Sequence, residues 1–203
     1  MSAEWLKLDT KDKETLLAAV NPYITPVPFK VENTTVRKRA LPFYKDFAFY
    51  ELSDMSTVPG ARKYALSNGK SVYMVNWTNA PIYEVNEIAP ITLDEQSVVD
   101  YVKFFFAYVR GRHGRFVIVE NLDEIKWQNE PPRQGRKMIK EMLRPVTYLN
   151  TDKNGNYKLE AFMVFKDALF HTLIHVAPDG EVTMSDEEIK IEGMPVIQDA
   201  MIA

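Results

Sequence analysis

Two histidines four residues apart, His171 and His175, have the spacing that places two imidazoles on one side of a helix. A metalloprotease would carry a glutamate after the first histidine, but Thr172 stands there. The β-branched residues around them favour a strand, on which they share one face about 13 Å apart. That separation is too large for both to bind one metal ion. We therefore predict no metal site and two half-buried sheet histidines; the functional alternative is that His171 and His175 line a ligand pocket.

A second metal-like pattern starts at Asp152, where Asp152, Asn154 and Asn156 imitate positions 1, 3 and 5 of an EF-hand loop. Tyr157 takes the place of the required glycine, and Met163 takes the place of the bidentate glutamate. The pattern fails at its two most demanding positions. We expect a polar hairpin turn here and no bound cation.

A cluster of basic side chains occurs where a predicted helix ends, at Arg110, Arg112, His113 and Arg115. Cations are favoured at a helix C-terminus by the helix dipole, which accounts for the cluster without a ligand. The alternative is an anion or phosphate site, because the planar guanidinium binds oxyanions through two hydrogen bonds. Further basic side chains from the following segment would complete that site: Arg133, Arg136, Lys137, Lys140 and Arg144.

The motifs that define most enzyme classes are missing from the sequence. The absence of cysteine excludes disulfides, cysteine nucleophiles and Cys-based metal sites, and only 8 glycines occur. No phosphate-binding loop, dinucleotide fingerprint or Gly-x-Ser-x-Gly elbow is present. Carboxylate groups such as Asp186-Glu187-Glu188 lie in polar context and are expected to be solvated. We predict no catalytic residues and no cofactor, which favours a protein that is not an enzyme.

The elements that must position these residues begin with a helix that Asp9 caps and that runs to about Val20. Strands are expected over 29–39, 47–52, 62–67 and 70–77, with Asn68-Gly69 as a type I′ hairpin turn. A further weak strand is predicted over 82–88. Pro90 then marks a break between two halves of the chain.

The most clearly patterned element is an apolar helix over residues 93–110. Its start reads as a capping box, Thr92-Leu93-Asp94-Glu95, and its apolar stripe follows helical spacing. A strand over 115–120 and a basic helix over 133–143 follow. The remainder predicts an antiparallel meander, with strands over 146–149, 157–165, 169–176, 181–184 and 189–191.

This order of elements predicts an α+β fold in which helices pack on antiparallel, curved sheets. In residues 92–192 a helix followed by a meander resembles the element order of cystatin-like and NTF2-like folds; the resemblance concerns topology and implies no function. We expect an N-terminal α+β lobe over 1–90 and a C-terminal α+β lobe over 91–203. One composite compact domain is the alternative.

The net charge of −3 hides an uneven distribution along the chain. Residues 103–144 carry ten Lys or Arg and five Asp or Glu, whereas residues 145–203 carry four and ten. Basic and acidic regions of this kind can face each other in one fold or pair between subunits. The N-terminal residues show no apolar signal segment, and no apolar run reaches membrane-spanning length, so we expect a cytoplasmic protein without membrane contact.

These observations favour a non-catalytic soluble binding or assembly protein, with a homodimer as one expected form. The first alternative is a small-ligand pocket protein or enzyme with its site between helix 93–110 and the sheet. The second is nucleic-acid or phosphate binding through the basic segment 110–144, although the overall negative charge argues against a nucleic-acid partner. The sequence does not identify a particular protein or small molecule as the partner.

Overall fold

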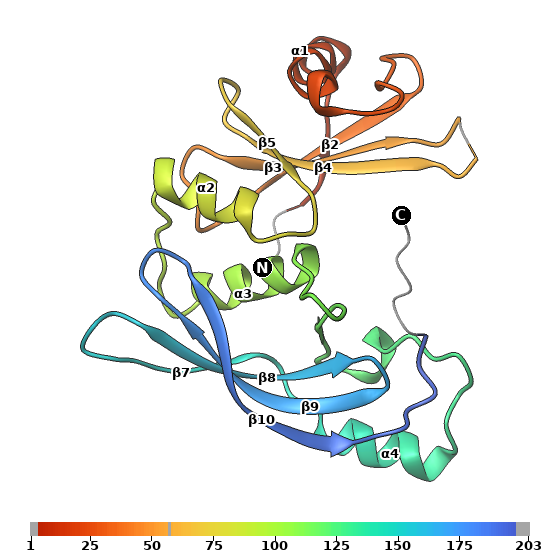
Figure 1. Cartoon of the computed structure of the whole chain (residues 1–203), viewed down its shortest axis with the longest axis vertical. Coiled ribbons are helices and arrows are strands. Elements are labelled where there is room, and N and C mark those ends of the chain that lie inside the picture. The colour runs from red at the N-terminus through yellow and green to blue at the C-terminus, as the bar shows by residue number, and fades with distance from the viewer. Residues whose placement is uncertain (1–3, 57, 198–203) are drawn as a thin grey trace. The chain divides into compact units, whose positions relative to one another are not determined.

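The computed structural model describes residues 4–56 and 58–197. The chain divides into two compact units, Met1–Thr92 and Leu93–Ala203, each with helices and a five-stranded antiparallel sheet (Figure 1). The predicted α+β class is confirmed.

The first unit contains a sheet in which all strands follow one another in chain order. Its elements are β1 (Leu6–Lys7), α1 (Thr10–Val20), a 3-10 turn (Asn21–Tyr23), β2 (Thr34–Ala40), β3 (Ala48–Asp54), β4 (Ala61–Ser67), β5 (Val72–Val75) and α2 (Ala80–Ile88).

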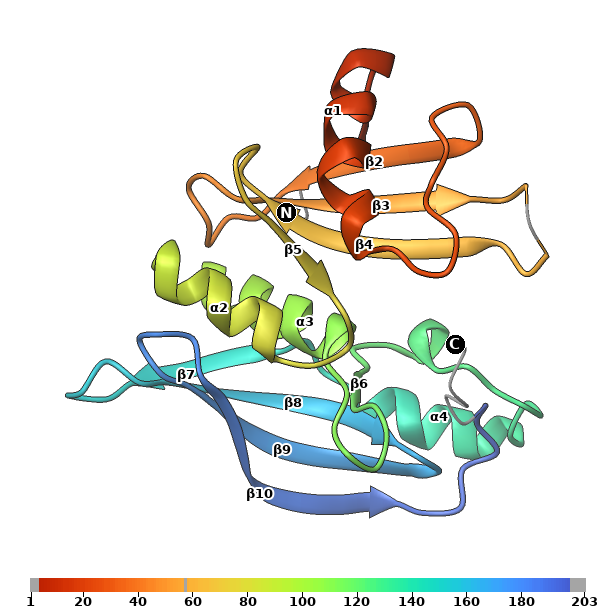
Figure 2. The same ribbon diagram turned by 45° about the horizontal axis from the view of Figure 1, so that its top comes forward.

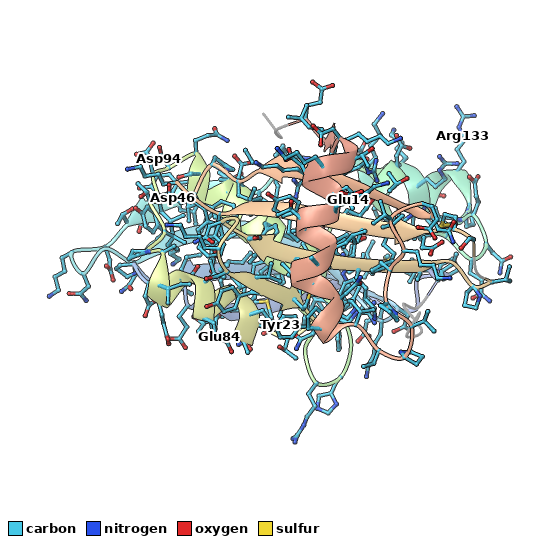
Figure 3. All side chains as sticks on the ribbon, turned by 90° about the horizontal axis from the view of Figure 1, so that it is seen from above. Glu14, Tyr23, Asp46, Glu84, Asp94 and Arg133 are labelled. Atoms are coloured by element: carbon cyan, nitrogen blue, oxygen red, sulfur yellow. The ribbon has the colours of Figure 1, made fainter. Side chains whose placement is uncertain are left out.

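Helix α1 lies across one face of this sheet, as Figure 3 shows from above. Asp9 caps it, because the Asp9 carboxylate accepts a hydrogen bond of 2.8 Å from the backbone N–H of Asp12. Leu16, Leu17 and Val20 are buried against residues of β2, β3 and β4. The predicted cap and core positions of this helix are thus confirmed.

Residues 82–88, predicted to form a strand, belong to helix α2, so this prediction is wrong. The buried side chains Ile82, Val85 and Asn86 lie at i, i+3 and i+4, which is a helical spacing. Pro81 stands in the first turn, where proline is preorganised for a helix. The hydroxyl of Tyr44 donates to the Asn86 side chain over 2.5 Å and ties the helix to its own unit.

The hairpin between β4 and β5 is not a type I′ turn. Ser67 pairs with Val72, so the loop has the four residues 68–71, and of Asn68 and Gly69 only the glycine has a positive φ, of 84°. The Asn68 side chain instead accepts hydrogen bonds from the N–H groups of Lys70 and Ser71. Asparagine stabilises turns through such bonds without itself needing a left-handed backbone.

The second unit places two helices before its main meander. Its elements are α3 (Ser97–Tyr108), β6 (Val117–Ile118), a 3-10 turn (Leu122–Glu124), α4 (Arg133–Met142), β7 (Thr147–Thr151), β8 (Tyr157–Phe165), β9 (Ala168–Val176) and β10 (Val182–Ile191). The sheet order is β10-β9-β8-β6, and β7 also pairs with β8. Figure 2 shows β10 along the outer edge.

Helix α3 is shorter than the predicted 93–110, and the predicted capping box does not form. The helix begins at Ser97, and Asp94 accepts hydrogen bonds from the N–H of Gln96, the N–H of Ser97 and the Ser97 hydroxyl. At its other end Val109 is already extended, so the helix stops at Tyr108, before Gly111. Its apolar side is buried as expected.

The two faces of the second sheet pack against different helices. Leu159, Met163 and Ile174 are fully buried on one face, where the Tyr157 hydroxyl donates over 2.7 Å to the Leu93 carbonyl just before α3. On the other face Phe162 and Leu169 pack with a cluster that includes Ile139 of α4. Strand β10 is continuous with two register shifts, where two short strands were predicted.

None of the helices in residues 4–56 and 58–197 combines the length and apolar character that crossing a bilayer requires.

Candidate functional site

The candidate site is a groove of about 580 Å³ in the first unit, between α1 and the part of the sheet face that α1 leaves uncovered. Ligand pockets commonly measure about 300–1,000 Å³, so the groove has room for a small molecule. The residues that line it come from β1, α1, β2, β3, the end of β4 and the loops beside these elements: Leu6, Lys7, Leu8, Asp9, Asp12, Thr15, Leu16, Ala19, Lys38, Asp46, Ala48, Tyr50, Ser67, Asn68 and Gly69.

One wall of the groove is a stripe along α1. Asp12, Leu16 and Ala19 lie at i, i+4 and i+7, so they occupy one side of the helix. Leu16 is buried, whereas Asp12 and Ala19 are exposed. The same helix therefore covers part of the sheet and offers an open, partly apolar wall to the rest.

The floor of the groove is formed by cross-strand neighbours of the sheet. Lys38 on β2 pairs with Tyr50 on β3, and Ala48 pairs with Ser67 on β4. The ammonium of Lys38 lies 5.9 Å from the centre of the Tyr50 ring, within the range of a cation–π interaction. Tyr50 is only 8% exposed, and its hydroxyl makes no hydrogen bond to any residue of the described chain. This hydroxyl is available to a ligand.

Sequence reasoning missed the groove, although one signal was present. Val36 and Lys38 are two residues apart on β2 and therefore lie on the same face, the one that packs on the core. Val36 is buried, whereas Lys38 is exposed. A lysine at an inward-facing strand position indicates that the helix stops short of it. The segment looked like an ordinary Val- and Thr-rich strand because the partner strand was unknown.

The predicted anion cluster is divided: Arg115 and Arg136 make internal contacts on different elements, and Arg112 and His113 are exposed. Arg115 donates to the carbonyls of Phe106 (3.4 Å) and Ala107 (2.9 Å) at the C-terminus of α3. Arg136 pairs with Glu130 over 2.8 Å on another element. Arg112 and His113 lie exposed at the tip of the tight turn where Gly111 pairs with Gly114, and Arg110 precedes that turn, half-buried. Arg115 thus lies at the C-terminus of a helix, where the sequence analysis placed the basic cluster without a ligand.

A smaller cavity of about 190 Å³ does lie between α3 and the strand that follows it. Lys103, Phe106, Arg115, Val117 and Glu120 are among its lining residues. Lys103 pairs with Glu120 over 2.7 Å, and Glu120 also accepts from the N–H of Val146 over 2.8 Å. The volume is below the usual range for ligand pockets and its charges are paired, so this cavity is the weaker candidate.

His171 and His175 do not line the cavity under α3. On β9 they alternate with the buried Thr172, Ile174 and Val176, which places them on the opposite face of the sheet. The expectation of a pocket shared by these histidines and helix 93–110 is corrected accordingly.

Each histidine has a side-chain partner on its own face. The imidazole of His171 lies 3.3 Å from Glu160 and 5.0 Å from the Phe162 ring, and that of His175 lies 2.9 Å from the Ser185 hydroxyl. Both residues are partly buried on one strand, as the structural interpretation predicted.

The EF-hand-like segment is a turn. The Asp152 carboxylate accepts from the N–H groups of Asn154 and Asn156 and from the Asn156 side chain. These bonds, led by the one from the Asn156 side chain, lower the pKa of Asp152 below its ordinary value. In the part of the chain that the structure describes, no three His, Asp or Glu side chains converge as metal ligands.

Comparison with known proteins gives no assignment. No family model, curated protein or solved structure matches this chain. The topological resemblance of residues 92–192 to cystatin-like and NTF2-like folds stays a prediction.

Proposed function

We propose that this protein is a non-catalytic binding protein whose groove under α1 takes a small amphipathic molecule. The observation that carries the proposal is the combination of volume and lining in one place. About 580 Å³ of space is bounded by apolar side chains of Leu6, Leu8 and Leu16 and by the unpaired hydroxyl of Tyr50. Ligand sites of this kind pair apolar walls with a few polar groups that fix orientation.

The polar groups of the groove define the head of the ligand. The Tyr50 hydroxyl and the Lys38 ammonium lie on neighbouring strands and can donate to one acceptor. Asp12 and Asp46 lie among the lining residues and can accept from a ligand donor. A molecule with an apolar body and a head that both accepts and donates hydrogen bonds fits this lining.

The lack of catalytic function in this proposal is supported by the state of the other candidate groups. Arg115 and Arg136 each contact an internal partner, and arginine stays protonated, so neither side chain supplies a nucleophile or a base. The groove itself holds no histidine.

The test blocks the groove without disturbing the core. Ala19→Phe adds a ring on the exposed wall, and Ala18→Phe adds the same ring at the neighbouring exposed position that does not line the groove. Binding is followed by titration with the apolar anionic dye anilinonaphthalene sulfonate. We expect Ala19→Phe to weaken dye binding by about tenfold or more and Ala18→Phe to leave it unchanged.

A second variant tests the head group. Tyr50→Phe keeps the ring and removes only the hydroxyl, so a loss of one hydrogen bond predicts roughly two- to tenfold weaker binding. Native mass spectrometry of the purified protein shows in addition whether a small molecule copurifies. Equal dye affinity in Ala18→Phe, Ala19→Phe and the parent protein would contradict the proposal.

A further inference from the structure

The second unit separates its surface charges onto two elements. On α4, Arg133, Lys137 and Lys140 lie at i, i+4 and i+7, all exposed, and Arg144 follows the helix. Met138, in the middle of this helix, is 47% exposed. We call these five residues the basic strip.

The acidic counterpart is the edge strand β10. Asp186, Glu187, Glu188 and Glu192 are exposed along or just after it. Ile189 stands among them and is 50% exposed. We call these five residues the acidic strip. In the described residues β10 pairs only with β9, so its other edge is open (Figure 2).

Most charges of the two strips are not neutralised within the chain. Lys137 reaches Glu141 only at 3.8 Å, and Glu188 pairs with Lys190 over 2.6 Å. Within the described ranges, Arg133, Lys140 and Glu187 form no ion pair. Each strip therefore presents unpaired charges of one sign around one half-exposed apolar side chain. Protein interfaces commonly have such an apolar centre and a polar rim.

We propose that a second copy of this chain is the partner of both strips. In the resulting two-fold dimer the basic strip of each copy lies on the acidic strip of the other. Because a two-fold axis makes each contact occur twice, one complementary pair of surfaces is sufficient for closure. This proposal stands on the second unit and does not depend on ligand binding by the groove.

Two other partners fit the observations less well. Direct pairing of two β10 edges would place the acidic strips against each other, and the left-handed backbone of Asp186 (φ 50°) and two register shifts distort the strand. A nucleic acid would meet a unit with an unfavourable charge: residues 93–203 carry 14 Lys or Arg and 18 Asp or Glu. A second copy brings its own acidic strip to the basic one.

The first measurement is sedimentation velocity of the full chain at micromolar concentrations. Surface charge interactions act over about 30 Å at about 0.01 M salt and only about 3 Å at about 1 M salt. We expect a dimer at the low salt concentration and a monomer at the high one. A protein that is monomeric at both salt concentrations would overturn the proposal.

Charge reversal then identifies the surfaces. Arg133→Glu with Lys140→Glu leaves two positive and two negative side chains in the basic strip, and Glu187→Lys with Glu192→Lys leaves two of each sign in the acidic strip. Each double variant alone should dimerise at least tenfold more weakly, because the changed side chains then meet like charges. An equimolar mixture should recover dimerisation as a heterodimer, because one of its contacts then joins the unchanged basic strip of one copy to the unchanged acidic strip of the other.

A matched control carries the same charge change elsewhere. Lys11→Glu with Lys45→Glu alters two exposed lysines of the first unit and should leave the dimer unchanged. A dimer that persists in both strip variants, or no recovery in the mixture, would refute this interface. Binding of a fluorescein-labelled oligonucleotide is measured as well. If the parent stays monomeric and binds the oligonucleotide, and only Arg133→Glu with Lys140→Glu loses that binding, the partner of the basic strip is a polyanion and not a second copy.

Discussion

Side chains outside helix α3 close both of its ends. Asp94 accepts from the backbone N–H groups of Gln96 and Ser97 at its start, and Arg115 donates to two carbonyls of its last turn. Both contacts satisfy backbone groups that a helix leaves unpaired at its termini. Arg115, which the sequence suggested as part of an anion site, instead contacts the end of this helix.

The Asp94 contact predicts a pH dependence of stability. Hydrogen bonds from Ser97, first from its backbone and then from its hydroxyl, lower the pKa of Asp94 below its ordinary value of 3.8. A carboxylate with a lowered folded-state pKa contributes stability above its unfolded-state pKa and loses it as the pH falls through the folded-state pKa. We therefore expect Asp94→Asn to be less stable than the parent at neutral pH.

The measurement is urea unfolding of both proteins between pH 7 and pH 2. The difference in unfolding free energy should be constant at neutral pH and shrink below about pH 3.8, where the parent loses its own charge. Asp123→Asn changes an exposed aspartate whose carboxylate caps no helix and serves as the control. A difference that grows on acidification would contradict the assignment.

At the scale of elements, Gly135 is a removable weakness in α4. The glycine lies inside the helix, and a Cβ added there would meet nothing nearer than Pro131 at 4.0 Å. Because glycine costs a helix interior about 1 kcal/mol relative to alanine, Gly135→Ala should raise the unfolding free energy by up to that amount.

Gly155 gives the opposite expectation and serves as the comparison. It has φ of 83°, and an added Cβ would lie 3.2 Å from the Pro178 side chain. Gly155→Ala should therefore destabilise the protein by roughly 1 kcal/mol or more. Thermal unfolding of both variants and the parent measures the two changes in unfolding temperature, which should have opposite signs. Equal changes in the two variants would show that backbone conformation does not determine the effect of the substitutions.

The elements that the sequence predicted well are those with a periodic pattern of their own. Strands β8 and β9 alternate buried and half-buried residues, and their ends agree with the predicted 157–165 and 169–176 within one residue. Helix α2 was missed because its nine residues give a short apolar run in which helix and strand periods are hard to separate. Its helical form depends on burial of Ile82 and Val85, which is a tertiary property.

At the scale of the whole molecule, two hydrophobic clusters lie in different units. One joins Leu16, Leu17 and Val20 to the first sheet, and the other joins Ile139 and Leu143 to Leu169. The N–H of Thr92 donates to the Phe43 carbonyl over 3.1 Å, so the first unit holds its own last residue. Each unit has a core of its own.

We therefore expect fragments 1–92 and 93–203 each to fold when expressed alone. Each should give a dispersed amide spectrum and a cooperative thermal transition, because its cluster is complete within the fragment. A fragment 1–79, which lacks α2, is the comparison and should be less stable. Failure of 1–92 to give a cooperative transition would show that its core needs residues of the second unit.

The groove could not be derived from the sequence because its walls come from four strands, the loops beside them and one helix. Lys38 and Tyr50 become neighbours only through the β2–β3 register, and both line the groove together with residues of α1. By contrast, the basic and acidic strips each lie on one continuous segment. Their residues were visible in the sequence, whereas their exposure on separate elements was not.

The contact that Arg115 makes with the end of α3 also determines what the turn before it can tolerate. The guanidinium holds the returning chain against the helix, so the exposed tip at Arg112 and His113 is not needed to keep the two together. A short epitope tag or a dye-labelled peptide inserted between these two residues should be accommodated without loss of the fold. The turn is thus a practical attachment point for immobilising the protein.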